Sequence, residues 1–388
     1  MAMKIEVVST ETIKPSSPTP SHLKNFKLCL LDQLAPPKLE NFALTGTLPL
    51  GGRVKVNTAI DCNDEGALYL EAKAHFELSE VLLKPDINQL QQFHPFSPCR
   101  VALNNEEPVI VGIQANFFDC GGIGIGICIS HKIADGASAS AFLTAWSEIA
   151  LNGINCKASR ITPFLKASEL FPPKDVNFQM PRRFTSREKL STKRFRFDGE
   201  SLARLRARKR PEWKEKSPPS SAATQTVNIR SRMRPQPLPE NALGNLWQTT
   251  VAPLMDAHKG LELQDLAGIL RKSMTAIDGE YLSVLQGEKG LAKAYESLVA
   301  ARKLAESSPG KMELYGFSSW VNFPFYEVDF GLARPAWACT TGYPIENMVF
   351  LMGTRCGKRI KAWITLRKHD MIEFEHNDEV LQFVSLSP

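Results

Sequence analysis

Residues 130–136 read Ser-His-Lys-Ile-Ala-Asp-Gly and mark a change from strand to helix. Before them, residues 123–129 alternate isoleucine with small residues, a period-2 pattern typical of a strand with one packed face. After them, apolar residues recur at helical spacing from Phe142 to Ala150. His131 is therefore expected at a strand end, where a neutral imidazole can accept a proton near pH 7 and act as a general base.

The spacing His-x-x-x-Asp is not specific when it stands alone. A second interpretation of the same residues is a structural histidine at a strand-to-helix turn, with Asp135 capping the helix. Both interpretations stay open on spacing alone.

Composition indicates an ordinary globular protein. A chain of 388 residues with 43% hydrophobic content is long enough for two domains with real cores. A net charge of +6 is a mild excess for this length and gives no nucleic-acid signature. The eight cysteines are scattered without a Cys-x-x-Cys pair, as expected for reduced cysteines of an intracellular protein, and no metal site is predicted. We see no signal peptide and no apolar run long enough to span a membrane, so a cytoplasmic location is expected.

A basic stretch punctuated by prolines divides the chain. We predict an N-terminal domain over residues 1–175, a crossover or linker over 176–220, and a C-terminal domain over 221–388. The cationic run at residues 204–210 could attract a polyphosphate or a nucleic acid, but no aromatic interleaving accompanies it, so a solvated helix end is the preferred interpretation.

Strand patterns also occur at residues 4–9, 26–32, 67–76 and 109–118. In the second half, strands are expected at 226–232, 317–321, 337–342, 347–353 and 361–366, with helix over 280–304.

The histidine motif is followed much later by Asp329-Phe330-Gly331. This ordered pair of motifs resembles the BAHD acyl-CoA-dependent acyltransferases of plant specialised metabolism, and the details are most similar to the alkaloid-acylating branch. The likeness runs nearly end to end; its further markers are residues 50–53 (Leu-Gly-Gly-Arg), 61–64, 228–233, 244–245 and 319–320.

The resemblance implies an α/β fold of two domains, each a mixed sheet with helices, and an active-site channel between them. It implies that acyl-CoA, with acetyl-CoA expected, is a cosubstrate and that a small-molecule alcohol such as an alkaloid is the acceptor. His131 would be the general base of O-acyl transfer without a covalent enzyme intermediate. Asp135 would be structural and pair with Arg230, or else with Arg232; Gly136, Asp329 and Gly331 would also be structural. A monomer that binds neither nucleic acid nor membrane is expected, and the residues that bind CoA are not identified.

The sequence departs from the family in three places. The second motif continues Leu332-Ala333 where the family has Trp-Gly, and two stretches look deleted, between Pro37 and Leu48 and between Ser217 and Thr224. Missing core elements would leave apolar faces and sheet edges uncovered. Two alternatives therefore accompany O-acyl transfer: a catalytically impaired relative that acts as a binding protein, and an N-acyltransferase or esterase on the same scaffold.

Overall fold

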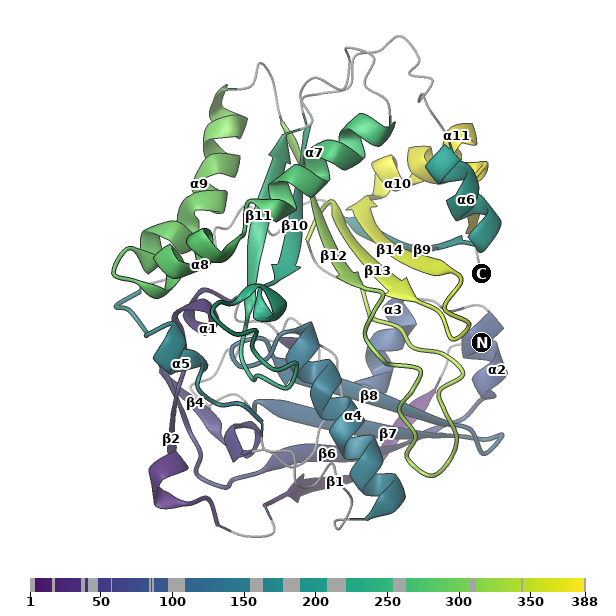
Figure 1. The fold of residues 1–388 in the computed structure, drawn as a ribbon. Helices are drawn as coiled ribbons and strands as arrows, with labels where there is room; N and C mark the ends of the chain where they lie inside the picture. The colour runs from purple at the N-terminus through teal and green to yellow at the C-terminus, as the bar shows by residue number, and fades with distance from the viewer. Residues whose placement is uncertain are drawn as a thin grey trace.

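The computed structural model places two mixed sheets one above the other (Figure 1). The N-terminal sheet has the strand order β1-β6-β7-β8-β3, and the C-terminal sheet has the order β11-β10-β12-β13-β14-β9-β15. A third, small sheet has the order β2-β5-β4. The predicted α/β fold of two domains, each with a mixed sheet and helices, is confirmed. The structure describes residues 4–15, 18–35, 39–40, 48–56, 58–83, 85, 87–96, 109–153, 163–176, 189–207, 221–253, 263–307, 312–342 and 345–386.

Each large sheet combines parallel and antiparallel pairs. In the N-terminal sheet β6 and β7 are parallel and the other neighbours antiparallel. In the C-terminal sheet β12 is parallel to both β10 and β13. The strands are β1 (Ile5–Ile13), β2 (Asn25–Lys27), β3 (Leu39–Glu40), β4 (Arg53–Val56), β5 (Ala59–Asp61), β6 (Ala67–Ala74), β7 (Val111–Phe118), β8 (Ile123–Ser130), β9 (Leu190–Phe197), β10 (Ser221–Asn228), β11 (Trp247–Pro253), β12 (Glu313–Trp320), β13 (Met348–Gly353), β14 (Ile360–Arg367) and β15 (Ser385–Leu386).

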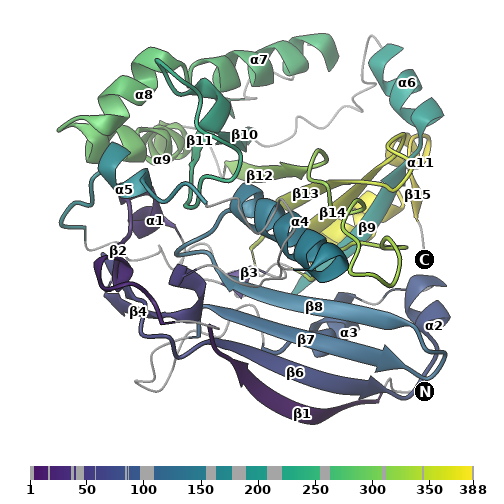
Figure 2. The same ribbon diagram turned by 60° about the horizontal axis from the view of Figure 1, so that its bottom comes forward.

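One long helix, α4 (Gly136–Asn152), lies between the two large sheets (Figure 2). It begins directly after the turn that carries His131, so the strand-turn-helix unit predicted from residues 123–150 is confirmed. The other helices are α1 (Leu30–Leu34), α2 (Leu78–Leu83), α3 (Ile87–Leu90), α5 (Ala167–Leu170), α6 (Gly199–Ala207), α7 (Leu263–Thr275), α8 (Gly279–Gln286), α9 (Gly290–Ser307), α10 (Lys368–Glu375) and α11 (Asp378–Leu381).

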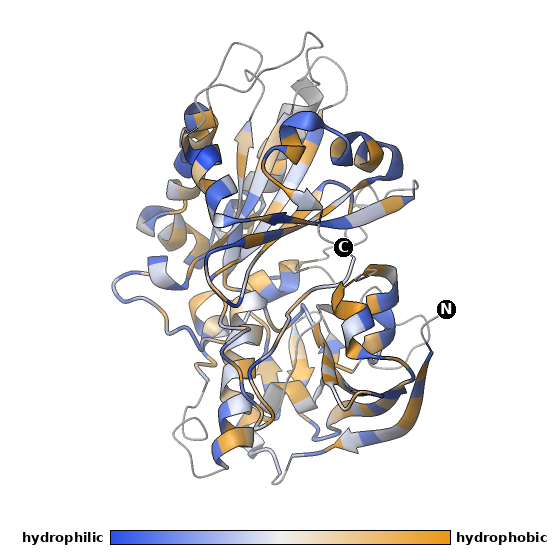
Figure 3. Ribbon diagram, turned by 90° about the vertical axis from the view of Figure 1, so that its right-hand side faces the viewer, coloured by the Kyte–Doolittle hydropathy of each residue, from blue (hydrophilic) through white to orange (hydrophobic). Residues whose placement is uncertain are grey.

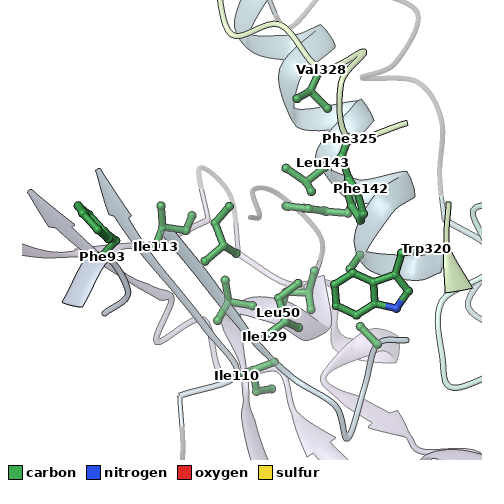
Figure 4. Close-up of a cluster of buried hydrophobic side chains, with 14 of the residues drawn as sticks. Leu50, Phe93, Ile110, Ile113, Ile129, Phe142, Leu143, Trp320, Phe325 and Val328 are labelled. Carbon is green, nitrogen blue, oxygen red and sulfur yellow. The ribbon is translucent and has the colours of Figure 1, made fainter. Parts of the chain in front are cut away.

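The largest hydrophobic core joins the two domains. It contains Ile129 from β8 and Phe142 from α4, together with Trp320 from β12 and Phe350 from β13. Figure 4 shows residues of this core from both halves of the chain meeting beside α4. Because burying a large apolar side chain stabilises a fold by about 1.5–3 kcal/mol, this shared core holds the two sheets in one arrangement.

Burial in the N-terminal sheet decreases toward the turn between β7 and β8. Figure 3 shows hydrophobic and hydrophilic residues alternating along the strands of this sheet. Phe117, Ile123 and Ile125 near the turn are exposed by 37–41%. Ile123 and Ile125 project from the same face of β8 as the buried Ile127 and Ile129, so burial changes along the strand and not from one face to the other.

Four sequence expectations were wrong in part. Residues 190–197, predicted as linker, form β9 and pair along their whole length with β14 inside the C-terminal sheet. Residues 26–32 end a short strand and begin α1. Residues 226–232 leave the sheet at Asn228 and form a 3-10 turn over Arg230–Arg232. Residues 337–342 form no strand. The residues present at the two predicted deletions, between Pro37 and Leu48 and between Ser217 and Thr224, lie mostly outside the described part of the chain.

Candidate active site

His131 lies directly after β8 and is held from both domains. Its side chain is buried, with 7% of the residue exposed. Its backbone carbonyl accepts a hydrogen bond of 2.7 Å from Nδ2 of Asn245, which precedes β11 of the C-terminal sheet. The centroid of its ring lies 6.1 Å from that of Trp247. The histidine therefore sits where the end of an N-terminal strand meets the C-terminal sheet.

Asp135 begins α4 and closes the same junction. Its Oδ1 accepts a hydrogen bond of 2.8 Å from the backbone N–H of Ser138, which caps the helix. Arg230 donates two hydrogen bonds to the carboxylate, Nη1 to Oδ2 at 2.8 Å and Nη2 to Oδ1 at 2.9 Å. The predicted pair of Asp135 with Arg230 is thus present, and the predicted alternative, Arg232, donates to backbone carbonyls at the end of α7 and just beyond it.

Arg230 is fully buried, and its guanidinium is saturated with acceptors. Besides Asp135 it donates to Oγ of Ser138 and to the carbonyls of Ala242 and Gly244, at 2.9 to 3.1 Å through Nη2. A buried guanidinium with this many partners is costly to leave unpaired, because removing one member of a buried pair typically costs about 3–5 kcal/mol.

A buried carboxylate on α1 positions Asn245. Asp32 accepts hydrogen bonds from the backbone N–H and from Nδ2 of Asn245, at 2.7 and 2.9 Å, and from the backbone N–H of Cys29. Burial raises the pKa of the Asp32 carboxyl, and these hydrogen bonds oppose the rise. Sequence reasoning gave no site role to Asp32, or to Asn245, which was noted only as a marker of the resemblance; the available signal for Asp32 was a lone carboxylate in a mostly apolar run at residues 28–34.

The side chain of Lys132 reaches α1. Its Nζ donates to the backbone carbonyl of Gln33 at 3.1 Å. Burial lowers the pKa of Lys132 to about 8, and the nearby carboxylate of Asp32 acts in the opposite direction. Lys132 thereby links the turn that carries His131 to α1.

Gly136 is required by a close approach of the two domains. A Cβ at this position would lie 2.8 Å from the ring of Phe323 and 3.6 Å from Nε1 of Trp320. Real Cβ atoms do not come so close to ring carbons, so a larger residue here would push the start of α4 away from the C-terminal sheet.

The second motif lies at the far end of α4. The backbone N–H of Gly331 donates to Oδ1 of Asp329 at 2.9 Å, and Gly331 has a φ of +86°. Phe330 packs edge-to-face on Trp146 of α4 with ring centroids 4.4 Å apart. The structure therefore groups His131, Asp135, Gly136 and Arg230 at one place and puts Asp329 and Gly331 in another.

The two substitutions in this motif have different consequences. Leu332 is 68% exposed, so it contributes little packing. Ala333 has a φ of +151°, a backbone conformation that side chains with a Cβ rarely adopt. The expected conflict at Ala333 is thus visible in the backbone.

Among the described residues, no group of three or more His, Cys, Asp and Glu side chains could hold a metal ion. In the same part of the chain, no helix has the length and apolar content needed to cross a membrane.

Comparison with known proteins decides the family. The model of the Transferase family matches residues 42–217 and 202–381, which together cover most of the chain. This chain belongs to that family, the BAHD acyltransferases. This BAHD acyltransferase is 34% identical to stemmadenine O-acetyltransferase of Catharanthus roseus over 96% of each chain. It is 32% identical to vinorine synthase of Rauvolfia serpentina, also over 96% of each chain.

Solved structures agree with the fold of the BAHD acyltransferase. Vinorine synthase superposes with a TM-score of 0.75 at 29% identity over 99% of both chains. TRI101 of F. sporotrichioides, solved with coenzyme A and T-2, superposes with a TM-score of 0.64 over 93% of this chain and 99% of its own; at 15% identity it supports the fold alone. The enzyme class and the alkaloid-acylating branch predicted from the motifs, the branch that includes vinorine synthase, are confirmed.

The alignments also bear on the missing stretches. The alignment with stemmadenine O-acetyltransferase runs over 429 positions, more than the 388 residues of this chain. The relative therefore has residues at positions where this BAHD acyltransferase has none, as expected if segments are absent.

Proposed function

We propose that this acyltransferase transfers an acetyl group from acetyl-CoA to a hydroxyl of a small-molecule acceptor, with His131 as the general base. One observation carries the proposal: His131 is fixed at the junction of the two sheets by Asn245 on its carbonyl and by the buried pair of Asp135 and Arg230 four residues on. A histidine whose backbone is fixed between two domains meets the positional requirement of base catalysis on two bound substrates.

The reaction needs no covalent enzyme intermediate. The imidazole of His131 removes the proton of the acceptor hydroxyl as the oxygen attacks the thioester carbonyl. The tetrahedral oxyanion collapses, the carbon–sulfur bond breaks, and the CoA thiolate leaves and takes the proton back from the imidazolium. The products are an ester and free CoA, and thiolate is a good leaving group.

The assignments of donor and acceptor draw on the relatives. Stemmadenine O-acetyltransferase and limonoid 1-O-acetyltransferase of Citrus sinensis, the latter 30% identical over 99% of each chain, are named for transfer of acetyl groups to oxygen. The TRI101 structure holds coenzyme A. We assign acetyl-CoA as the cosubstrate and an alkaloid or another specialised metabolite with a free hydroxyl as the acceptor, and we expect a cytoplasmic monomer with a channel between its two domains.

The other site residues have supporting roles in this proposal. Asp135, Arg230 and Gly136 hold the histidine turn against the C-terminal sheet, whereas Asp329 and Gly331 shape the loop that packs on α4 through Phe330. None of these five residues takes part in proton transfer.

A second candidate follows from Ala333. Its strained backbone and the missing alignment positions favour a relative that binds CoA or the acceptor without turnover.

The test is to incubate the full chain with acetyl-CoA and a panel of hydroxylated alkaloids and limonoids, and to measure free CoA and acetylated product. An acetyl ester that forms only with protein and acceptor supports O-acetyl transfer. An amide product would establish N-acylation, and CoA release without acceptor would establish thioester hydrolysis. Saturable CoA binding without product would support the binding-protein candidate.

A further inference from the structure

A second group of polar side chains lies on the inner face of the C-terminal sheet, away from His131. Arg196 of β9 is paired with Lys361 of β14, and Arg194 is paired with Trp363. Paired residues of antiparallel strands project from the same face, so these four side chains form one patch. The connection between β12 and β13, which descends from the sheet toward α4 in Figure 1, adds Tyr326 and Trp337.

This patch is rich in hydrogen-bond donors. Lys361 donates to the neutral hydroxyl of Tyr326 at 3.2 Å, and neither Lys361 nor Arg196 forms an ion pair with a described carboxylate. Nε of Arg196 and the indole Nε1 atoms of Trp337 and Trp363 are buried without a hydrogen-bond partner in the described part of the chain. Trp363 is 1% exposed, so its N–H cannot turn to bulk water.

Such an arrangement is unfavourable when empty. A buried donor without an acceptor costs about 1–3 kcal/mol, and a half-buried cation without a counter-charge adds to this cost. The pKa of Lys361 is lowered to about 8, mainly by burial and also by the positive charges of Arg194 and Arg196. An oxyanion between these groups would satisfy the donors and the charge together.

The surroundings favour a carboxylate on an apolar body. The guanidinium carbon of Arg194 lies 5.5 Å from the ring centroid of Trp337 and 5.9 Å from that of Trp363. The two indole rings lie 6.3 Å apart, and the partly exposed ring of Trp337 offers flat apolar surface beside the donors. Arg194, Arg196 and Lys361 are half-buried rather than fully enclosed, so a small molecule can reach them.

We propose that Arg196, Lys361 and the indole N–H groups of Trp337 and Trp363 form a binding site for the carboxylate of a flat organic acid. The site lies on the sheet face that carries Trp320, because Lys361 pairs with Met352 and Met352 with Trp320. Two strand spacings, roughly 10 Å, separate the proposed site from Trp320, whose indole Nε1 lies beside Gly136 at the start of α4. That the bound acid is the acyl acceptor rests on the proposed function; binding itself does not.

Calorimetric titration of the full chain, without acetyl-CoA, tests the site with three probes. Benzoate offers the carboxylate on a flat ring, methyl benzoate is its neutral counterpart, and inorganic phosphate is an oxyanion without an apolar body. We expect saturable binding of benzoate only. Lys361→Met should weaken benzoate binding at least about tenfold, the loss of one charge-assisted contact. Lys361→Arg should retain it, and the exposed control Lys368→Met should leave it unchanged.

Several outcomes would overturn the proposal. These are the absence of saturable benzoate binding, equal binding of methyl benzoate, tighter binding of phosphate, or full benzoate affinity in Lys361→Met. Thermal melts show that each variant is folded, and Trp337→Phe, which removes one indole N–H, supplies a second variant whose benzoate affinity should also fall. Acetyl transfer without benzoate binding would refute this site alone, whereas benzoate binding without transfer would refute the proposed function alone.

Discussion

The carboxylate of Asp135 and the guanidinium of Arg230 form a two-pronged ion pair, at 2.8 and 2.9 Å, that joins the N-terminal domain to the C-terminal sheet. The two residues are 95 positions apart in the chain, and 5% and 0% of their surfaces are exposed. Asp135 lies four residues after His131 in the chain, so the stability of the domain junction and the placement of the histidine are linked.

Removal of either partner should destabilise the fold. We expect Asp135→Ala and Arg230→Ala each to lower the free energy of unfolding by about 3–5 kcal/mol, because each leaves a buried charge unpaired. The double variant should lose less than the sum of the two. Denaturant unfolding measures all three, with Lys166→Ala, from an exposed pair with Glu169, as a control expected to lose less than about 1 kcal/mol. Strictly additive losses would show that the two residues do not interact.

Gly136→Ala should impair both stability and turnover. The new methyl group would meet the ring of Phe323 at 2.8 Å, and overpacking of this kind costs about 1–3 kcal/mol. The second substitution Phe323→Leu should restore part of the loss by opening space. Gly268→Ala in α7, where nothing lies within 4 Å of the added Cβ, is the matched control and should stabilise by up to about 1 kcal/mol. A neutral effect of Gly136→Ala would mean that the two domains do not approach as described.

Ala333→Gly should raise the melting temperature. The φ of +151° at Ala333 carries strain of about 1–3 kcal/mol that glycine does not experience, against an entropic cost of about 0.5–1 kcal/mol. Leu332→Ala, at the exposed neighbouring position, should change stability by less than about 0.5 kcal/mol. A lower melting temperature for Ala333→Gly would show that this backbone conformation is not strained.

The absent segments should matter more than the altered motif. Each large apolar side chain that a missing helix would bury is worth about 1.5–3 kcal/mol, and several of them exceed the 5–15 kcal/mol by which a typical domain is stable. Insertion of the relatives' segments between Pro37 and Leu48 and between Ser217 and Thr224 should therefore increase soluble yield and CoA release. If the unmodified chain is already soluble, melts cooperatively and turns over acetyl-CoA, the deletions are compensated and this prediction fails.

Local sequence patterns predicted the strand and the helix on either side of His131. The alternation at residues 123–129 and the helical spacing after Gly136 depend only on neighbours in the sequence, and β8 and α4 follow them closely. β9 was mistaken for linker because its cations lie among proline-rich basic segments. Only its pairing with β14, which begins more than 150 residues later, shows that Arg194 and Arg196 are part of a sheet.

The motif residues of the candidate site could be predicted from the sequence, but the residues that hold them in place could not. Asp135 and Arg230 were paired on the family resemblance, and the choice of Arg230 over Arg232 depends on a 3-10 turn that the strand pattern concealed. Asp32 was assigned to a strand, whereas its carboxylate caps α1 and binds Asn245, 213 residues away. A contact over that distance leaves no local pattern in a single sequence.

The most direct test of the central claim, that His131 is the general base, is the rate of acetyl transfer by His131→Ala. The substitution keeps the backbone carbonyl that binds Asn245, so the melting temperature and CoA affinity should stay near those of the parent chain. Loss of the base should lower the rate on the order of 10²–10⁴-fold, while the exposed control His22→Ala should match the parent. Transfer by a folded His131→Ala chain within about threefold of the parent, far from the loss expected for a general base, would contradict the account.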